Sequence, residues 1–137
     1  MKTMTGPVAR LLFVVPFAVS GLFHLANARA MAGMVPVPAG VFWVYFTGVA
    51  LLAGAAGVAS GRLGQWAGLG LAALMVTFVA AIHVPGLGNP ETQQMAMAGL
   101  LKDLGLAGGA LTWAGIFMRA GRPATPPAAR LAEQGAE

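Results

Sequence analysis

The sequence predicts an all-α integral membrane protein, a four-helix bundle with its N and C termini in the cytoplasm. Its 137 residues are 58% hydrophobic and only 9% charged, whereas soluble domains carry roughly 25% charged residues. Four apolar stretches come close to the roughly 20 residues that a helix needs to cross a bilayer. The basic residues gather in the segments that these four crossings bring to one side of the membrane.

The four predicted spans run over about 8–28, 41–60, 65–83 and 97–118. Residues 1–122 therefore form one transmembrane domain, and the Pro-, Ala- and Arg-rich residues 123–137 are predicted to be a disordered cytoplasmic tail. The Ala-Asn-Ala sequence at 26–28 also resembles a signal-peptide cleavage site. The first apolar run is longer than the roughly 7–15 residues of a signal-peptide core, so we favour a membrane span.

The orientation follows from counting basic residues. Four crossings leave only Arg29, with Lys102 just inside the bilayer, on the side opposite the termini. The other six lie beside the termini and the 61–64 turn: Lys2, Arg10, Arg62, Arg119, Arg122 and Arg130. Cytoplasmic loops carry an excess of Lys and Arg, which places both termini in the cytoplasm. Because these residues are scattered at loop ends, the net charge of +4 indicates a lipid bilayer as partner and no nucleic acid.

Two absences limit the chemistry of this chain. It contains no cysteine, which excludes thiol redox chemistry, disulfides and iron–sulfur clusters held by its own residues. Kinase, hydrolase and dinucleotide signatures are also missing, and Gly-Leu-Gly at 86–88 is too short for a phosphate-binding loop.

The fourth apolar stretch contains a charged pair. Residues 104–118 alone would make about 15 residues, or roughly 22 Å of helix, against a hydrocarbon core of roughly 30 Å. The helix must therefore extend back past Lys102 and Asp103, and charge inside a span suggests a functional site. In the alternative interpretation, Lys102 snorkels to the interface and Asp103 faces a loop. Neighbouring residues do not face each other on a helix, so we expect separate partners: His24 or Arg29 for Asp103, and Glu91 for Lys102.

The predicted topology brings the unusual polar residues to one depth, near the outer face. A polar pocket with an apolar body beneath it is a natural ligand site. Its predicted ligand-binding residues are His24, His83, Lys102, Asp103, Arg29, Glu91, Phe23 and Trp43. No catalytic residue is assigned.

Several ligands suit such a pocket. A quinone head needs hydrogen-bond donors, which His24 or His83 with Lys102 would supply, and a free histidine, with a pKa of about 6.5, is suited to proton exchange. Haem b held by the two histidines is less favoured, because His83 ends a span beside proline. A metal site with Asp103 or Glu91 lacks any local ligand spacing, and no metal is expected. The alternative is that each histidine merely lies at the interface, bonded to carbonyls or water.

Four motifs in order resemble the DoxX family of small four-helix bacterial membrane proteins. They are Ser-Gly-Leu-Phe-His at 20–24, Val-Pro-Val-Pro at 35–38, Thr-Gly-Val with Leu-Leu-Ala-Gly across 47–54, and Leu-Lys-Asp-Leu-Gly-Leu-Ala-Gly-Gly at 101–109. The likeness covers roughly residues 8–118. Two positions depart from the family pattern: the acidic residue of the second helix falls at Ala50, and the family's Asn falls at Asp103. An acidic group is therefore lost here or moved to Asp103.

The resemblance implies a multi-pass protein of the bacterial cytoplasmic (inner) membrane, associated with membrane oxidoreductases or their oxidative-stress complexes. It does not imply that this subunit transfers electrons. We therefore expect an accessory, quinone-binding subunit of an oxidoreductase, with other membrane subunits as partners. Two alternatives stay open: a non-redox carrier of a small lipophilic molecule, and an assembly subunit whose Gly-rich faces bind other membrane helices. So small a bundle is also compatible with a homodimer.

Overall fold

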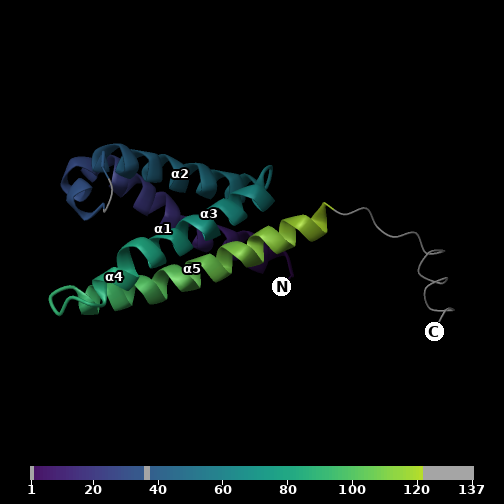
Figure 1. The fold of residues 1–137 in the computed structure, drawn as a ribbon. Coiled ribbons are helices and arrows are strands. Elements are labelled where there is room, and N and C mark those ends of the chain that lie inside the picture. The colour runs from purple at the N-terminus through teal and green to yellow at the C-terminus, as the bar shows by residue number, and fades with distance from the viewer. Residues whose placement is uncertain (1, 36–37, 122–137) are drawn as a thin grey trace, which may run out of the picture.

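A computed structural model describes residues 2–35 and 38–121. Every regular element within these ranges is helical (Figure 1). The elements are α1 (Lys2–Met31), η1 (Ala32–Met34), α2 (Gly40–Ser60), α3 (Gly64–Phe78), η2 (Val79–His83), α4 (Val84–Gly86) and α5 (Gln93–Ala120). Pro36 and Val37 of the predicted proline loop lie outside the described residues, as does the predicted disordered tail, 123–137.

Three segments are long and apolar enough to cross a membrane: Gly6–Met34, Gly40–Ser60 and Gly64–Gly86. They contain the first three predicted spans entirely. The fourth predicted span falls within α5, which is 28 residues long but is not among the three. The charges of Lys102 and Asp103, together with many glycines, lower the hydropathy of α5, so composition alone does not mark it as a span.

The first helix continues beyond the predicted end at residue 28 and bends at Asn27. Asn27 has non-helical backbone angles, φ −119° and ψ 21°. Its side-chain Nδ2 donates to the Phe23 carbonyl at 3.0 Å. A side chain that bonds the carbonyl four residues earlier competes with the helical ladder, which accounts for the bend here. After the bend, Met31 leads into η1, which turns the chain toward α2.

The third helix contains a wide turn that the sequence analysis missed. We expected the third span to end at residue 83, but the helix continues through η2, a π-helix, and α4 before ending at Gly86. Val84 N–H bonds the Val79 carbonyl, five residues back. Pro85 explains the position of this turn, because its ring would clash with the carbonyl four residues earlier in a regular α-helix. The π-helix widens the backbone there and so rotates His83 relative to α3.

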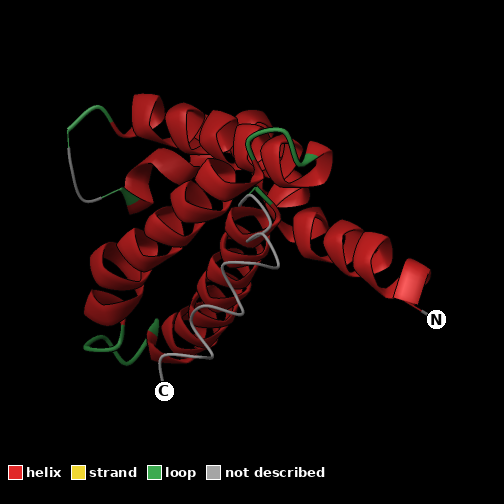
Figure 2. Cartoon of the chain, turned by 90° about the vertical axis from the view of Figure 1, so that its right-hand side faces the viewer, coloured by secondary structure: helices red, strands yellow, loops and turns green. Residues whose placement is uncertain are grey.

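The helices pack in two layers, α1 with α2 and α3 with α5 (Figures 1 and 2). Small residues let the backbones approach: a Cβ on Gly21 would meet the Gly48 carbonyl at 2.9 Å, and one on Gly68 would meet the Ala110 carbonyl at 2.8 Å. Between the layers, Leu71 of α3 fills the space over Gly54 of α2. Close backbone approach of this kind is typical of helices that pack in a membrane.

The residues with no exposed surface lie toward the α2–α3 turn: Val58, Ala110 and Ala114. Gly61, at φ 73°, ends α2 in the left-handed conformation that glycine adopts at no steric cost. At the other end, where η1 and α4 lie, the two layers are farther apart (Figure 1). The described core thus closes one end of the molecule and leaves the other end open.

Candidate functional site

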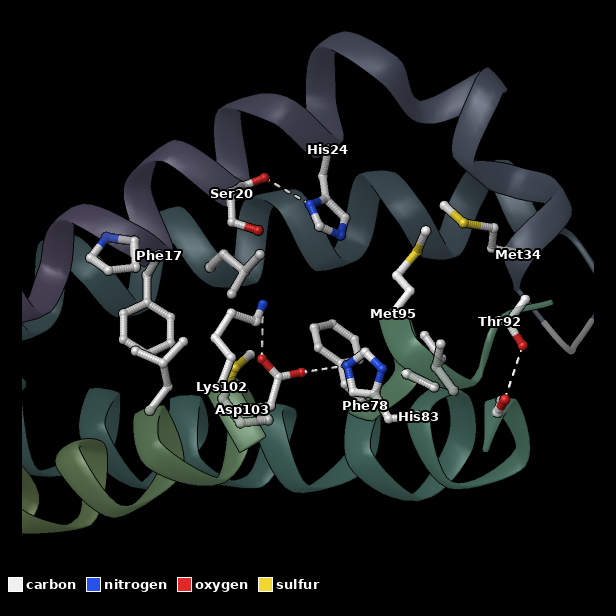
Figure 3. A pocket seen from close by; sticks show the side chains of 17 residues that line it. Phe17, Ser20, His24, Met34, Phe78, His83, Thr92, Met95, Lys102 and Asp103 are labelled. Carbon is white, nitrogen blue, oxygen red and sulfur yellow. Dashed lines mark hydrogen bonds and ion pairs between the residues drawn. The ribbon is translucent and has the colours of Figure 1, made fainter. Parts of the chain in front are cut away.

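A cavity of about 480 Å³ lies between α1, the end of the third helix and the first half of α5 (Figure 3). Its walls are mostly apolar, with Phe17, Leu51 and Phe78 among them. Four of the predicted ligand-binding residues line it: His24, His83, Lys102 and Asp103. The volume falls within the roughly 300–1,000 Å³ typical of small-molecule sites, which also combine apolar walls with a few polar groups.

Asp103 is the polar centre of this cavity. It is the buried polar residue of the described core, only 1% exposed. Its Oδ2 lies 2.9 Å from His83 Nε2. Since a carboxylate only accepts hydrogen bonds, His83 Nε2 carries the hydrogen and donates it to Asp103. We expected Asp103 to pair with His24 or Arg29, and this prediction is wrong. His83, at the end of the π-helix, is its hydrogen-bond partner instead.

Gly99 makes the His83–Asp103 contact sterically possible. It lies one helical turn before Asp103 on α5, so the two share a face. A Cβ built on Gly99 would collide with the His83 ring, at 2.6 Å from Nδ1 and 2.8 Å from Nε2. The imidazole thus lies directly against the α5 backbone. Any side chain at position 99 would push it away from the carboxylate.

Lys102 also pairs with Asp103, contrary to the sequence-based expectation. Lys102 Nζ lies 3.0 Å from Asp103 Oδ1. We expected neighbouring residues not to meet, but the long lysine chain folds back over the carboxylate (Figure 3). The contact lacks hydrogen-bond geometry, so Oδ1 is a buried acceptor that receives no hydrogen bond from the described residues. Because the Lys102 side chain is 63% exposed, solvent screens this pair and we expect it to add little stability.

His24 faces the same cavity from α1. Its Nδ1 lies 2.7 Å from the Ser20 carbonyl oxygen. A carbonyl only accepts, so Nδ1 is the donor and Nε2 is left without a partner among the described residues. The ring lies nearly parallel to Phe78, with an interplanar angle of 7° and centroids 6.5 Å apart. In Figure 3 the second ring nitrogen of His24 points from α1 into the space above α5.

A second cavity, also of about 480 Å³, adjoins the first under η1, between α1, α2 and α3. His24 and Phe78 line both cavities. Trp43, another predicted ligand-binding residue, lines the second cavity and not the first. The two spaces thus meet at the His24–Phe78 pair.

The remaining predicted site residues do not join the cluster. Phe23 is 57% exposed and lines neither cavity. Arg29 and Glu91 are exposed. In the described ranges neither has an ion pair, so the expected pairing of Glu91 with Lys102 is wrong. Nor does the described part of the chain bring together three or more His, Cys, Asp or Glu side chains that could hold a metal ion.

A signal in the sequence could have revealed which way Asp103 points. One face of α5 carries only small residues apart from this aspartate. That face contains Ala96, Gly99, Asp103, Ala107, Ala110 and Ala114. Spacings of three and four residues place all six on one side of the helix, the side that packs on α3. An acidic residue inside such a face is predicted to be buried at a helix–helix contact.

The fold and the site define an apolar helical protein with a mostly apolar cavity and a buried His–Asp pair in its wall. The chain belongs to the family described as "Domain of unknown function (DUF8561)", whose model matches residues 13–104. That range holds both histidines and the Lys102–Asp103 pair. No curated protein and no solved structure matches the sequence significantly. The resemblance to the DoxX family stays a prediction.

Proposed function

We propose that this protein binds a small lipophilic molecule of the quinone type in the first cavity, as an accessory subunit of a membrane oxidoreductase. The observation that carries the proposal is the His83–Asp103 pair, which opens onto an apolar cavity together with His24 and Lys102. A flat polar head suits the cluster, and an apolar body suits Phe17, Leu51 and Phe78. The resemblance to the DoxX family supplies the oxidoreductase context.

In this proposal the protein is a four-helix bundle in the bacterial inner membrane, with both termini in the cytoplasm. Two observations support a common end for the first part of α1, the α2–α3 turn and the end of α5. Arg10 Nη1 donates to the Ala59 carbonyl at 3.3 Å, and its guanidinium lies over the rings of Trp113 and Phe117. Arg10 of α1 thus contacts the end of α2 and the end of α5. Arg10, Arg62 and Arg119 belong to that end, as expected for a cytoplasmic face.

The chain's own groups would position a ligand without carrying electrons. His83 is held by Asp103, His24 is held by the Ser20 carbonyl, and each ring keeps one nitrogen for the ligand. Bound quinone would supply the redox chemistry, exchanged with a partner subunit. The histidines would hold or move a proton at the head, and the apolar walls would exclude water from it.

The test is to purify the full chain in mild detergent and analyse the extracted lipids by mass spectrometry beside a visible absorption spectrum. We expect stoichiometric quinone or quinol, reduced at least severalfold in His24→Ala and unchanged in the surface variant Thr112→Ala. No quinone species, or equal amounts in all three proteins, would overturn the proposal.

The mostly apolar walls of the cavity also favour one alternative from another class, a carrier of a lipophilic molecule without redox function. The same mass spectra decide between them, because a co-purifying molecule with no redox-active ring would favour the carrier.

A groove between α2 and α3, lined by Ala50, Gly57 and Gly70, favours the assembly-subunit hypothesis, since small residues let a partner helix approach. Cross-linking to one stoichiometric membrane partner would support that role.

A further inference from the structure

We infer that the cavity selects a ligand whose head donates a hydrogen bond, such as a phenolic or quinol hydroxyl, over one that only accepts, such as a quinone carbonyl or an ether. This inference rests on the proposed ligand-binding function and specifies its chemistry. It depends on which atoms of the polar cluster are already in use.

Each histidine uses its N–H donor in a hydrogen bond to the protein itself. His24 Nδ1 donates to the Ser20 carbonyl at 2.7 Å, and His83 Nε2 donates to Asp103 Oδ2 at 2.9 Å. A neutral imidazole has one N–H and one lone pair. The nitrogens left over, His24 Nε2 and His83 Nδ1, are therefore acceptors. Neither has a hydrogen-bond partner in the described ranges, and neither is sealed from solvent.

The third unused polar atom is also an acceptor. Asp103 Oδ1 is buried and receives no hydrogen bond from the described residues. The Lys102 ammonium covers it at 3.0 Å as an ion pair, so this oxygen is already neutralised by the protein. His83 Nδ1 lies against the α5 backbone at Gly99, which leaves His24 Nε2 as the acceptor that is open to a ligand hydroxyl.

The cavity also holds donors. The Thr92 hydroxyl donates to the Gly86 carbonyl at 2.9 Å, but the Ser20 hydroxyl has no hydrogen bond to the described residues and the Lys102 ammonium has three hydrogens for one ion pair. A carbonyl-only head could therefore accept from these groups but would leave the lone pair of His24 Nε2 without a hydrogen. A hydroxyl would donate to His24 and could still accept from them, which gains one hydrogen bond more. The sequence-based expectation that the histidines donate to a quinone carbonyl is thus reversed.

The experiment compares three probes with one alkyl chain: decylphenol, its methyl ether, and decyl-para-benzoquinone. Binding to the detergent-solubilised full chain is measured by calorimetry against a micelle blank, at mildly alkaline pH, at which a free imidazole is neutral. The phenol is expected to bind about tenfold tighter than the ether, the effect of one hydrogen bond. In His24→Phe the affinity for the phenol should fall to that for the ether. Binding of the ether in this variant shows that the site is still folded.

The matched control is Thr112→Val, which removes another hydrogen bond to a carbonyl four residues earlier, at an exposed position of α5. It should keep the tenfold ratio. Tighter binding of the quinone than of the phenol, or a ratio that survives in His24→Phe, would overturn the inference and leave the proposed function standing. Failure of all three probes to bind would overturn the proposed function as well.

Discussion

Each end of the molecule buries part of a charged side chain, but the groups that surround this side chain differ between the two ends. At the end that holds the α2–α3 turn, Arg10 Nε is buried without a hydrogen-bond partner. The guanidinium lies 5.6 Å from the Trp113 ring centroid and 5.4 Å from that of Phe117. Aromatic faces attract a cation, so the charge of Arg10 closes the gap between α1 and α5.

At the cavity end, Asp103 Oδ1 is the buried atom without a hydrogen bond. Its neighbours are the polar groups of His83 and Lys102, and Asp103 lines the first cavity. The same apolar helices thus form a packed end, in which the Arg10 side chain packs between helices. They also form an open end, in which the Asp103 side chain faces a cavity. We expect stability to reside mainly in the packed end and ligand binding in the open end.

The largest stability loss is expected for Leu71→Ala in the packed core. Leu71 is 2% exposed and fills the space over Gly54. Truncation leaves a cavity, and we expect a loss of about 3 kcal/mol in the free energy of unfolding. Ligand binding at temperatures where the variant is folded should not change. Circular dichroism in a detergent titration measures the loss, and Leu104→Ala, at a half-exposed leucine of α5, is the matched control.

Should Leu71→Ala lose no more stability than Leu104→Ala, the packed end would not be the main source of stability. A loss of binding in Leu71→Ala at full helicity would likewise break the comparison, since Leu71 does not line the first cavity.

The second prediction is that Gly99→Ala destabilises the protein and abolishes ligand binding. The added methyl collides with the His83 ring, and overpacking of this kind costs about 2 kcal/mol. Pushing His83 off Asp103 also removes the polar wall of the cavity. A thermal melt and ligand titration on one preparation report both effects.

Gly108→Ala is the control on the same helix, because nothing lies within 4 Å of a Cβ built there. Alanine is the better helix former, so Gly108→Ala should be neutral or slightly stabilising. Equal melting points for the two variants would mean that His83 does not depend on the bare backbone at Gly99.

Asp103→Asn should have a smaller effect on stability, about 1 kcal/mol. The amide keeps the volume and one acceptor, and the lost partner Lys102 is 63% exposed, so solvent replaces that interaction. His83 keeps a hydrogen-bond acceptor in this variant. Glu91→Gln, at an exposed glutamate, should change nothing measurable. A loss of several kcal/mol in chemical denaturation would instead identify Asp103 as a main stabilising group.

The sequence predicted the apolar segments well and the polar contacts poorly, for physical reasons. Membrane-length hydrophobicity depends on composition, so 41–60 was predicted within one residue of α2 (Gly40–Ser60). That His24, His83 and Asp103 line one cavity followed from their shared depth. The His83–Asp103 bond did not follow, because it depends on a π-turn that Pro85 causes and on the bare backbone at Gly99. Neither feature produces a repeating hydrophobic pattern, so the hydropathy of the sequence does not reveal it.

The smallest predicted effect tests the packed end directly. Arg10→Lys keeps the charge but loses the planar guanidinium that covers two rings and bonds the Ala59 carbonyl. One cation–π contact at a partly exposed site is worth about 0.5–1 kcal/mol, so we expect a loss in that range, with unchanged affinity for the alkylphenol. Arg62→Lys, at an exposed position of the α2–α3 turn, should be neutral. If Arg10→Lys weakened ligand binding instead, the two ends would be coupled through α1 and α5, and the separation of stability from binding would fail.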